Sequence, residues 1–296
     1  MQQFTRRQFV TTATLATAGS LFPAQSNDTR ARVAVVRNGE PPELVRQAID
    51  MLGGISHFVQ PGQSVLIKPN MSWDRLPEQA ATTNPEAVAE VVRLCKQAGA
   101  RLIRIVDRTC NRAERCYYRS GIEKAATAAG AQVRHVVPSR FVDTTIPNGS
   151  LLSTWPVYKD VLDVDVLINM PIAKHHTIPG VTLGMKNIMG LIGGDRGDLH
   201  VDFDVKITDL NTIIRPALTL VDAYRILRRN GPSGGSLEDV EEKRMVIAGI
   251  DPVATDARAV QLFGLEPDKI AYLVQAHKRG LGEVDLTKVA VHDYSF

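Results

Sequence analysis

The sequence predicts an α/β fold of three layers, in which a mostly parallel sheet is covered by helices on both faces. Runs that are apolar almost throughout, such as 164–170, alternate with segments whose apolar residues recur every three or four positions. Strands that are apolar on both faces are typical of parallel sheets buried under helices, and the amphipathic segments supply those helices. A length of 296 residues, 44% of them hydrophobic, suits one large domain or two small ones.

The first half of the chain alternates between predicted strands and predicted helices. Short runs rich in Val, Ile and Leu predict strands at 32–37, 64–69, 102–107 and 132–137. Apolar residues at helical spacing predict helices at 43–52, 85–98 and 118–129. The second helix has the clearest limits, because Asn84 can cap its amino end, Pro85 suits its first turn and Gly99 stops it.

The alternation continues after an irregular stretch at 138–156. Strands are predicted at 164–170, 218–222 and 245–249, and helices at 182–191, 202–214, 252–263 and 268–279. Asp251 and Asp256 fit the N-cap and first turn of the third of these helices. The Gly-rich loop at 230–236 lies inside the alternation and no internal repeat is visible, so we predict one α/β domain from residue 30 to 296.

Composition and charge exclude several classes of protein. The 35 basic and 32 acidic side chains give a net charge of +3, which is no footprint for nucleic acid, so we expect no nucleic-acid partner. No run of 18 or more apolar residues occurs, so no membrane span is expected in the mature chain. Three cysteines are too few for a disulfide scaffold, although pairing of Cys110 with Cys116 stays open.

The first 26 residues are typical of a twin-arginine export signal. Arg6 and Arg7 precede a short, weakly apolar stretch and a small-residue cleavage pattern that ends near Ser26. The alternative is an ordinary first helix, but the segment shows no amphipathic period. Removing it leaves 33 basic and 32 acidic residues, a net charge of +1. We therefore expect the twin-arginine machinery to export the protein to the periplasm or the extracellular space.

Polar side chains follow the second predicted strand and begin the next predicted helix. Pro69 has no N–H for a sheet partner, so the strand ends there, between Lys68 and Asn70. Ligands of open parallel sheets bind beyond the carboxyl ends of the strands, where Thr82 at the start of a helix also lies. A solvated strand end and simple helix capping are the alternatives.

A second group of basic and polar residues follows the strand at 164–170. Lys174, His175 and His176 are expected in the loop after that strand, and Lys186 and Asn187 on a short helix with flanking glycines. Two lysines and adjacent histidines of this kind suit a carboxylate or phosphate ligand. Asp222, at the end of another apolar strand, is a candidate acid–base group.

An acidic loop offers a different interpretation, a divalent metal site. Asp195, Asp198 and His200 are the kinds of side chain that bind hard or borderline cations, and His175 and His176 could join them. The spacing matches no standard metal motif, and a solvated loop with Asp202 as a helix cap is the structural alternative. The Rossmann fingerprint, the P-loop and the Gly-x-Ser-x-Gly nucleophile motif are all absent.

Several ordered motifs together resemble domain-of-unknown-function family 362, from about residue 33 to the C-terminus. The motifs are Val65-Leu-Ile-Lys-Pro-Asn70, Thr82-x-Asn-Pro85, Ile168-Asn-x-Pro-x-x-Lys-x-His176, Thr182-Leu-Gly-Met-Lys-Asn187 with Gly190, Asp209-Leu-Asn211, Leu220-Val-Asp222, Gly231-Pro232 and Asp251-Pro-Val-Ala-Thr-Asp256. The resemblance implies an α/β domain and the site positions Lys68, Asn70, Lys174, His176, Lys186, Asn187 and Asp222, but no reaction. Where the family usually has Lys-Thr-His, this chain has Lys174-His175-His176. Many members carry ferredoxin-like cysteine clusters, and the spacing of Cys95, Cys110 and Cys116 argues against an iron–sulfur cluster here.

Three hypotheses follow from the sequence, and the cofactor remains unknown in all of them. The first is an exported enzyme that binds a small anionic ligand through Lys68, Asn70, Thr82, Lys174, Lys186 and Asn187, with His176 or His200 and Asp222 as acid–base groups. The second is a metal-dependent enzyme using His175, His176 and His200 with Asp195 or Asp198. The third is a non-catalytic binding or accessory protein for an exported partner.

Overall fold

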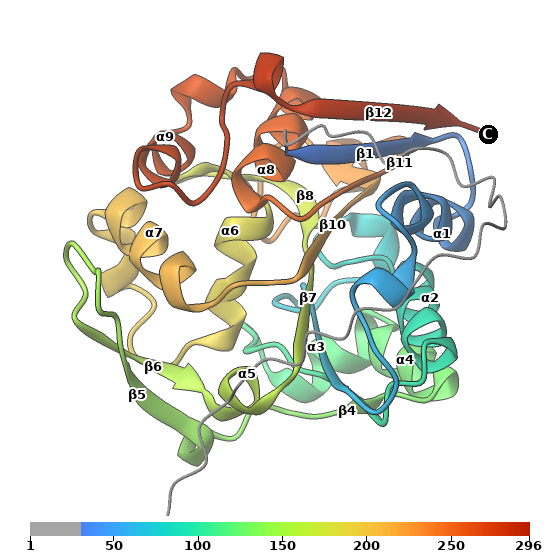
Figure 1. Cartoon of the computed structure of the whole chain (residues 1–296), viewed down its shortest axis with the longest axis horizontal. Helices are drawn as coiled ribbons and strands as arrows, with labels where there is room; N and C mark the ends of the chain where they lie inside the picture. Colours follow the sequence, from blue (N-terminus) through green and yellow to red (C-terminus); the bar gives the residue numbers. More distant parts are fainter. Residues whose placement is uncertain (1–30) are drawn as a thin grey trace, which may run out of the picture.

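The computed structural model describes residues 31–296, and a large mixed sheet runs through this part of the chain (Figure 1). The predicted export signal lies outside the described residues. The strands of the main path, in spatial order, are β12 (Ala290–Ser295), β1 (Arg32–Arg37), β11 (Val240–Gly249), β10 (Leu218–Leu227), β7 (Val166–Met170), β2 (Ser64–Pro69), β3 (Leu102–Ile105) and β4 (Gln132–Val133).

Most neighbouring strands of this sheet are parallel, as the sequence predicts. Only β11 runs antiparallel to both of its neighbours on the main path, β1 and β10. Beside the path, β8 (Ile172–His176) pairs in parallel with β10 and antiparallel with the short β9 (Gly180–Thr182). A separate antiparallel hairpin is formed by β5 (Phe141–Thr145) and β6 (Thr154–Tyr158).

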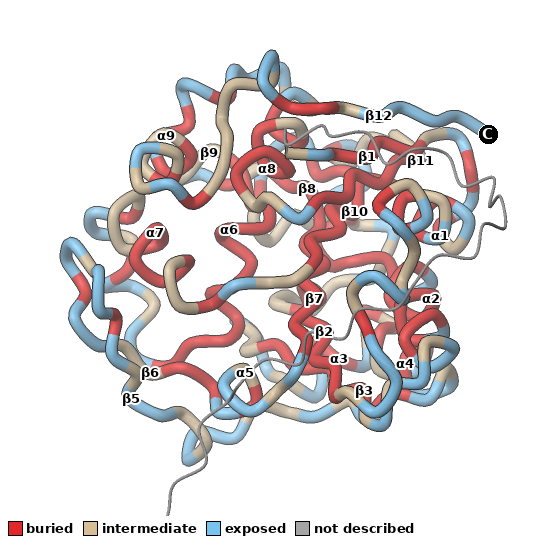
Figure 2. The backbone as a smooth tube through the Cα atoms, in the orientation of Figure 1, coloured by how far each residue is buried: buried red, intermediate tan, exposed pale blue. Residues whose placement is uncertain are grey.

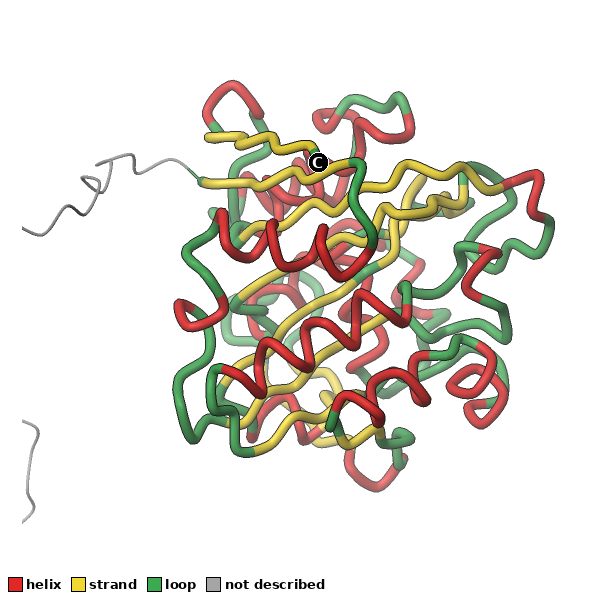
Figure 3. Tube along the Cα trace, turned by 90° about the vertical axis from the view of Figure 1, so that its right-hand side faces the viewer, coloured by secondary structure: helices red, strands yellow, loops and turns green. Residues whose placement is uncertain are grey.

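Helices pack on both faces of the sheet and confirm the α/β class. One face is covered by α1 (Pro41–Met51), α2 (Pro85–Gln97), α3 (Ala113–Arg119) and α4 (Ile122–Ala129), and Figure 3 shows helices of this layer in front of the strands. On the other face lie α6 (Gly184–Asn187), α7 (Phe203–Ile213), α8 (Pro252–Val260) and α9 (Ala271–Lys278). The short α5 (Lys159–Asp163) precedes β7.

Side-chain alternation along the strands divides the core into two layers. In β1, Val33 and Val35 join the core under α7 to α9, whereas Ala34 and Val36 join the core under α1 to α4. The central strands are therefore buried on both faces, which explains why they are apolar almost throughout (Figure 2). In the described part of the chain, no helix has the length and apolar character that crossing a bilayer requires.

Several predicted elements differ from the structure. The helix expected at 182–191 is only the one-turn α6 followed by a 3₁₀ turn at Ile188–Leu191, and the helix expected at 118–129 is broken at Gly121, which has a positive φ. The strand expected at 132–137 shrinks to two residues, and the irregular stretch at 138–156 contains the β5–β6 hairpin. Asp202 precedes α7, but its side chain makes no capping hydrogen bond.

The segment that carries Lys174 and His176 is also not the loop that we expect from the sequence. It forms strand β8, which follows β7 after Pro171 and pairs with β10. Because strand side chains alternate, Lys174 and His176 point to one face and His175 to the other. His175 accepts a hydrogen bond from the N–H of Gly231 at 3.2 Å on that other side.

Candidate functional site

A cavity of about 250 Å³ lies where β2 ends, next to β8, β9 and α6. Five residues that the sequence marks as candidates line it together, one just after β2, two on β8 and two on α6. They are Asn70, Lys174, His176, Lys186 and Asn187. His200, from the acidic loop, also lines the cavity. The structure therefore brings the two lysine segments and one histidine of the acidic loop to a single place.

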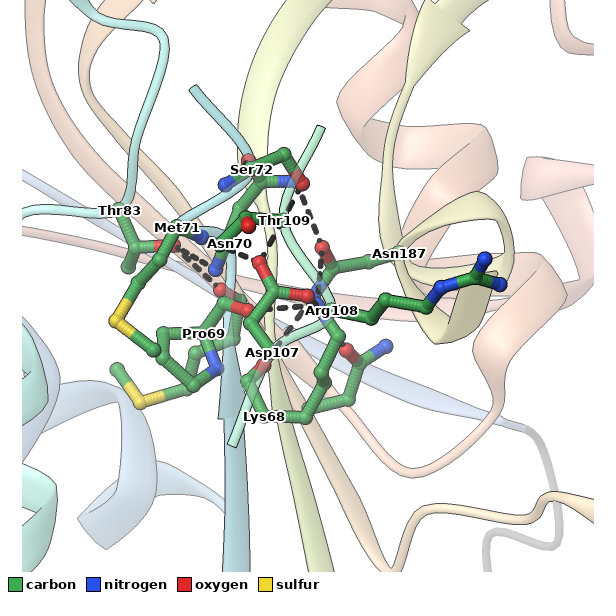
Figure 4. A network of polar contacts seen from close by, with 12 residues as sticks. Lys68, Pro69, Asn70, Met71, Ser72, Thr83, Asp107, Arg108, Thr109 and Asn187 are labelled. Atoms are coloured by element: carbon green, nitrogen blue, oxygen red, sulfur yellow. Dashed lines mark hydrogen bonds and ion pairs between the residues drawn. The ribbon is translucent and has the colours of Figure 1, made fainter. Parts of the chain in front are cut away.

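Lys68 does not line this cavity but holds a buried ion pair directly behind it. Its Nζ lies 2.9 Å from Oδ1 of Asp107, and both side chains are almost fully buried (Figure 4). The other oxygen of Asp107 accepts the N–H of Met71 at 2.6 Å, which ties the residues after β2 to the end of β3. Gly190 packs so closely that a Cβ there would lie 1.8 Å from Oδ1 of Asp107. The motif glycine is therefore required by this ion pair.

Asn187 is the centre of a buried amide network. Its Oδ1 accepts from Nζ of Lys68 at 3.0 Å and from Nδ2 of Asn70 at 2.9 Å. Its Nδ2 donates to Oδ1 of Asn169 at 2.8 Å and to the carbonyl of Lys68 at 3.2 Å. Because protein groups occupy both ends of the amide, Asn187 positions the wall of the cavity. Asn70 in turn accepts from Nζ of Lys174 at 3.1 Å.

The two lysines that line the cavity are buried without a carboxylate partner within salt-bridge distance among residues 31–296. Lys174 donates to Asn70 and, at 2.7 Å, to the carbonyl of Ala81. Lys186 contacts Sδ of Met189 at 3.3 Å and lies over the ring of Phe203. Burial lowers the pKa of Lys174 to about 7 and that of Lys186 to about 8, because water no longer stabilises the charged form.

The two histidines of the cavity stack on each other, with ring centroids 6.0 Å apart. Nδ1 of His176 accepts the N–H of Ile178 at 3.1 Å, so a neutral ring carries its proton on Nε2. Nδ1 of His200 lies 2.8 Å from the carbonyl of Arg196 and must donate to it, which leaves Nε2 of that ring as an acceptor. Burial and then the charge of Lys186 lower the pKa of both rings, that of His176 to about 2. One ring thus offers a donor and the other an acceptor.

Other lining residues are not among the site candidates of the sequence analysis, although Thr182, Gly190 and Pro232 belong to the motifs. Arg196 lines the cavity while two of its nitrogens donate to the carbonyls of Arg108 and Thr109, each at 2.8 Å. Thr182 is 4% exposed, and its hydroxyl has no hydrogen-bond partner in the described part of the chain. The remaining wall consists of Ser72, Trp73, Cys110, Met189, Gly190 and Pro232. The sequence around Arg196 is a Gly-rich loop without a recognisable motif, so it does not predict that this arginine lines the site.

Besides Lys68, two of the expected site residues, Asp222 and Thr82, also lie outside the cavity. Asp222 is buried beneath the start of α2, where its two oxygens accept the N–H groups of Asn84 at 2.6 Å and of Tyr224 at 3.0 Å. Burial raises the pKa of this carboxyl to about 6. Thr82 is buried and does not line the cavity. The expected pairing of a histidine with Asp222 is therefore not found in this arrangement.

The arrangement also does not assemble the expected metal ligands. Within residues 31–296, no group of three His, Cys, Asp or Glu side chains is placed to hold a metal ion. His175 points away from His176 along β8, and Oδ1 of Asp195 accepts the N–H of Gly197 in its own loop. His200 lines the cavity together with the two lysines, whereas Asp195 and Asp198 do not line it. The three cysteines are free, and they include the pair Cys110 and Cys116.

Buried carboxylates position α6, the helix that carries Lys186. The two oxygens of Asp256, in α8, accept the N–H groups of Gly184 at 2.7 Å and of Met185 at 2.8 Å. Asp251 caps α8 as the sequence predicts, because its side chain accepts from Val253 and Ala254. The N-cap prediction for Asp251 is thus confirmed, whereas the first-turn prediction for Asp256 is wrong, because Asp256 lies beyond the first turn of α8 and binds the start of α6 instead.

The chain belongs to the family described as domain of unknown function (DUF362), whose model matches residues 65–261. It is 27% identical over 246 residues to the thylakoid-associated protein sll1697 of Synechocystis sp. (strain ATCC 27184 / PCC 6803 / Kazusa). That alignment covers 80% of this chain and 74% of the relative. The family assignment confirms the resemblance seen in the sequence motifs over residues 65–261.

Two solved structures are similar over most of this chain but only at low identity. One is a protein from Thermotoga maritima, with a TM-score of 0.46, 12% identity and coverage of 76% of this chain. The other is the lactate racemase apoprotein from Thermoanaerobacterium thermosaccharolyticum, with a TM-score of 0.49, 12% identity and coverage of 80%. The chain spans 60% and 58% of the length of these two proteins.

Proposed function

We propose that the cavity binds a small molecule bearing a carboxylate or a phosphate. The observation that carries this proposal is the pair of buried lysines, Lys174 and Lys186, that face one cavity without a carboxylate partner among the described residues. A buried ammonium group without a counter-charge is destabilised, and an anion in the cavity supplies that counter-charge. Arg196 adds a third cation to the same wall. A cavity of about 250 Å³ suits a ligand smaller than a typical drug molecule.

The same site can move protons. His176 presents an N–H and His200 a free nitrogen, so the two rings form a complementary donor and acceptor beside the proposed anion. Because the pKa of both rings is lowered, both stay neutral near pH 7, which is the state that gives them opposite roles. We therefore assign acid–base chemistry to this histidine pair. Lys68 and Asn187 then act as positioning residues behind the wall, through Asp107 and the amide network.

Thermal unfolding in the presence of phosphate or acetate tests the binding proposal. A ligand at 100 times its Kd stabilises the folded state by about 2.7 kcal/mol, which is about 5 °C for a domain of this length. Lys174→Met and Lys186→Met remove the charges with little change in volume and should abolish this stabilisation. Lys278→Met, an exposed residue outside the cavity, is the matched control, with chloride at equal ionic strength. Equal stabilisation of all four proteins would overturn the proposal.

Export through the twin-arginine pathway is a separate proposal that the sequence around Arg6 and Arg7 supports. Cell fractionation of the full chain tests it. The natural sequence should appear in the periplasm or the medium, and a variant with both arginines changed to lysine should stay in the cytoplasm. Equal distribution of the two forms would contradict this proposal without affecting the binding site.

A further inference from the structure

The surroundings of the two cavity lysines differ in a way that separates their roles. Nζ of Lys174 is held by two oxygen acceptors, the side chain of Asn70 at 3.1 Å and the carbonyl of Ala81 at 2.7 Å. For Nζ of Lys186 the structure gives only soft contacts, Sδ of Met189 at 3.3 Å and the face of Phe203 at 5.2 Å from the ring centroid. Lys174 is thus held in place by two hydrogen bonds, whereas Lys186 has no oxygen acceptor for its protons among residues 31–296.

We propose that Lys186 is a nucleophile that forms an imine with the carbonyl group of a small anionic substrate, of which 2-oxo acids are the simplest class. This inference rests on the proposed anion-binding function. In the reaction, the nitrogen lone pair of Lys186 attacks the carbonyl carbon and a C–N bond forms. The carbonyl oxygen takes up the two protons that the nitrogen loses and leaves as water, and the product is a C=N bond. No oxidant or reductant is consumed.

The groups around Lys186 match what this step requires. A lysine becomes nucleophilic when burial or a neighbouring cation disfavours its charged form, and both conditions hold here. Burial lowers the pKa of Lys186 to about 8, so a substantial fraction of the amine is neutral at that pH. Lys174, on the same cavity wall, binds the carboxylate of a 2-oxo acid, and this opposite charge favours the charged form of Lys174 although burial lowers its pKa to about 7.

The histidine pair assists the proton transfers. The free Nε2 of His200 can accept each proton that the nitrogen loses and pass it to the departing oxygen, while the N–H of His176 donates a hydrogen bond to that oxygen. Both rings line the same cavity as Lys186, and the positive charge of that lysine lowers the pKa of both. The hydroxyl of Thr182 lies on the cavity wall without a hydrogen-bond partner among the described residues, and it is available to the substrate oxygen.

Borohydride trapping with pyruvate as the probe tests the inference. Borohydride reduces an imine to a stable secondary amine, so wild-type protein should gain one pyruvate-derived group, which peptide mapping should place on Lys186. The adduct should require both reagents. Lys186→Arg keeps the positive charge but lacks a comparable amine, so it should bind pyruvate, as thermal shift reports, and form no adduct. Lys278→Arg, changed at an exposed position, should label like the wild type.

The outcomes separate this inference from the binding proposal. Stabilisation by pyruvate without an adduct on Lys186 overturns the imine and leaves anion binding standing. Labelling of Lys278 to the same extent as Lys186 also overturns it, because the reaction is then that of any lysine. Stabilisation by phosphate but not by pyruvate rejects the 2-oxo acid class, and stabilisation by neither anion rejects both proposals.

Discussion

The buried pair of Lys68 and Asp107 gives the sharpest test of the fold behind the cavity. Asp107→Asn keeps the shape of the side chain but removes the charge that faces Nζ of Lys68 at 2.9 Å. Removing one partner of a buried ion pair typically costs 3–5 kcal/mol, because the remaining charge has no compensation, and so we expect a loss of about 4 kcal/mol. At roughly 2 °C per kcal/mol for a domain of this length, the midpoint of unfolding should fall by about 8 °C.

The pH dependence of that loss identifies its cause. Without Asp107, the pKa of Lys68 in the folded state falls further below its value in the unfolded chain, since burial already lowers it and the carboxylate no longer opposes this. Over the range between those two pKa values the unfolded chain holds more protons, so the stability of the variant rises with pH. Chemical denaturation at pH 6 and pH 9 should show a smaller deficit relative to wild type at pH 9. A loss below 1 kcal/mol, or a deficit that does not shrink with pH, would refute the reasoning.

Three further predictions follow from the site. The affinity for acetate, whose own charge is constant from pH 6 to 9, should fall over that range in calorimetry, because burial lowers the pKa of Lys174 to about 7 and that of Lys186 to about 8 and only the charged forms attract an anion; an affinity that is constant over this range would contradict the assignment. Gly190→Ala should destabilise the protein by several kcal/mol in urea unfolding, since its Cβ would collide with the buried carboxylate 1.8 Å away, and a stability within 0.5 kcal/mol of wild type would count against the packing described. Asp256→Ala should cost at least about 2 kcal/mol by leaving two buried N–H groups without acceptors, whereas the exposed Asp268→Ala should be nearly neutral, and equal effects would argue against the role of Asp256.

The sequence predicts those helices and strands whose ends are marked by capping residues or proline and whose buried positions are apolar. The helix that starts at Pro85 and the strand at Ser64–Pro69 are found within a residue of the predicted limits, because capping residues and proline mark their ends. The polar strand β8 (Ile172–His176) cannot be recognised in the same way. Its inward residues are Lys174 and His176, so the site itself removes the apolar pattern by which a buried strand is identified.

The candidate site shows the same limit. Strand-end reasoning finds Asn70, Lys174 and Lys186, because the ends of parallel strands meet at one edge of the sheet. It does not separate the lysines that face the cavity from Lys68, whose partner Asp107 is distant in sequence and carries no motif. The role of Arg196 is likewise set by a loop conformation that no periodicity encodes.

The cysteines have a practical consequence. Cys95 and Cys116 are buried, whereas Cys110 is exposed and lies at the wall of the cavity. A thiol-reactive fluorophore should therefore attach to the native protein at one position, next to the site that it reports on. The fluorescence of this label can then report whether a ligand occupies the cavity, without an introduced cysteine. A bulky reagent on the same thiol should block ligand binding sterically.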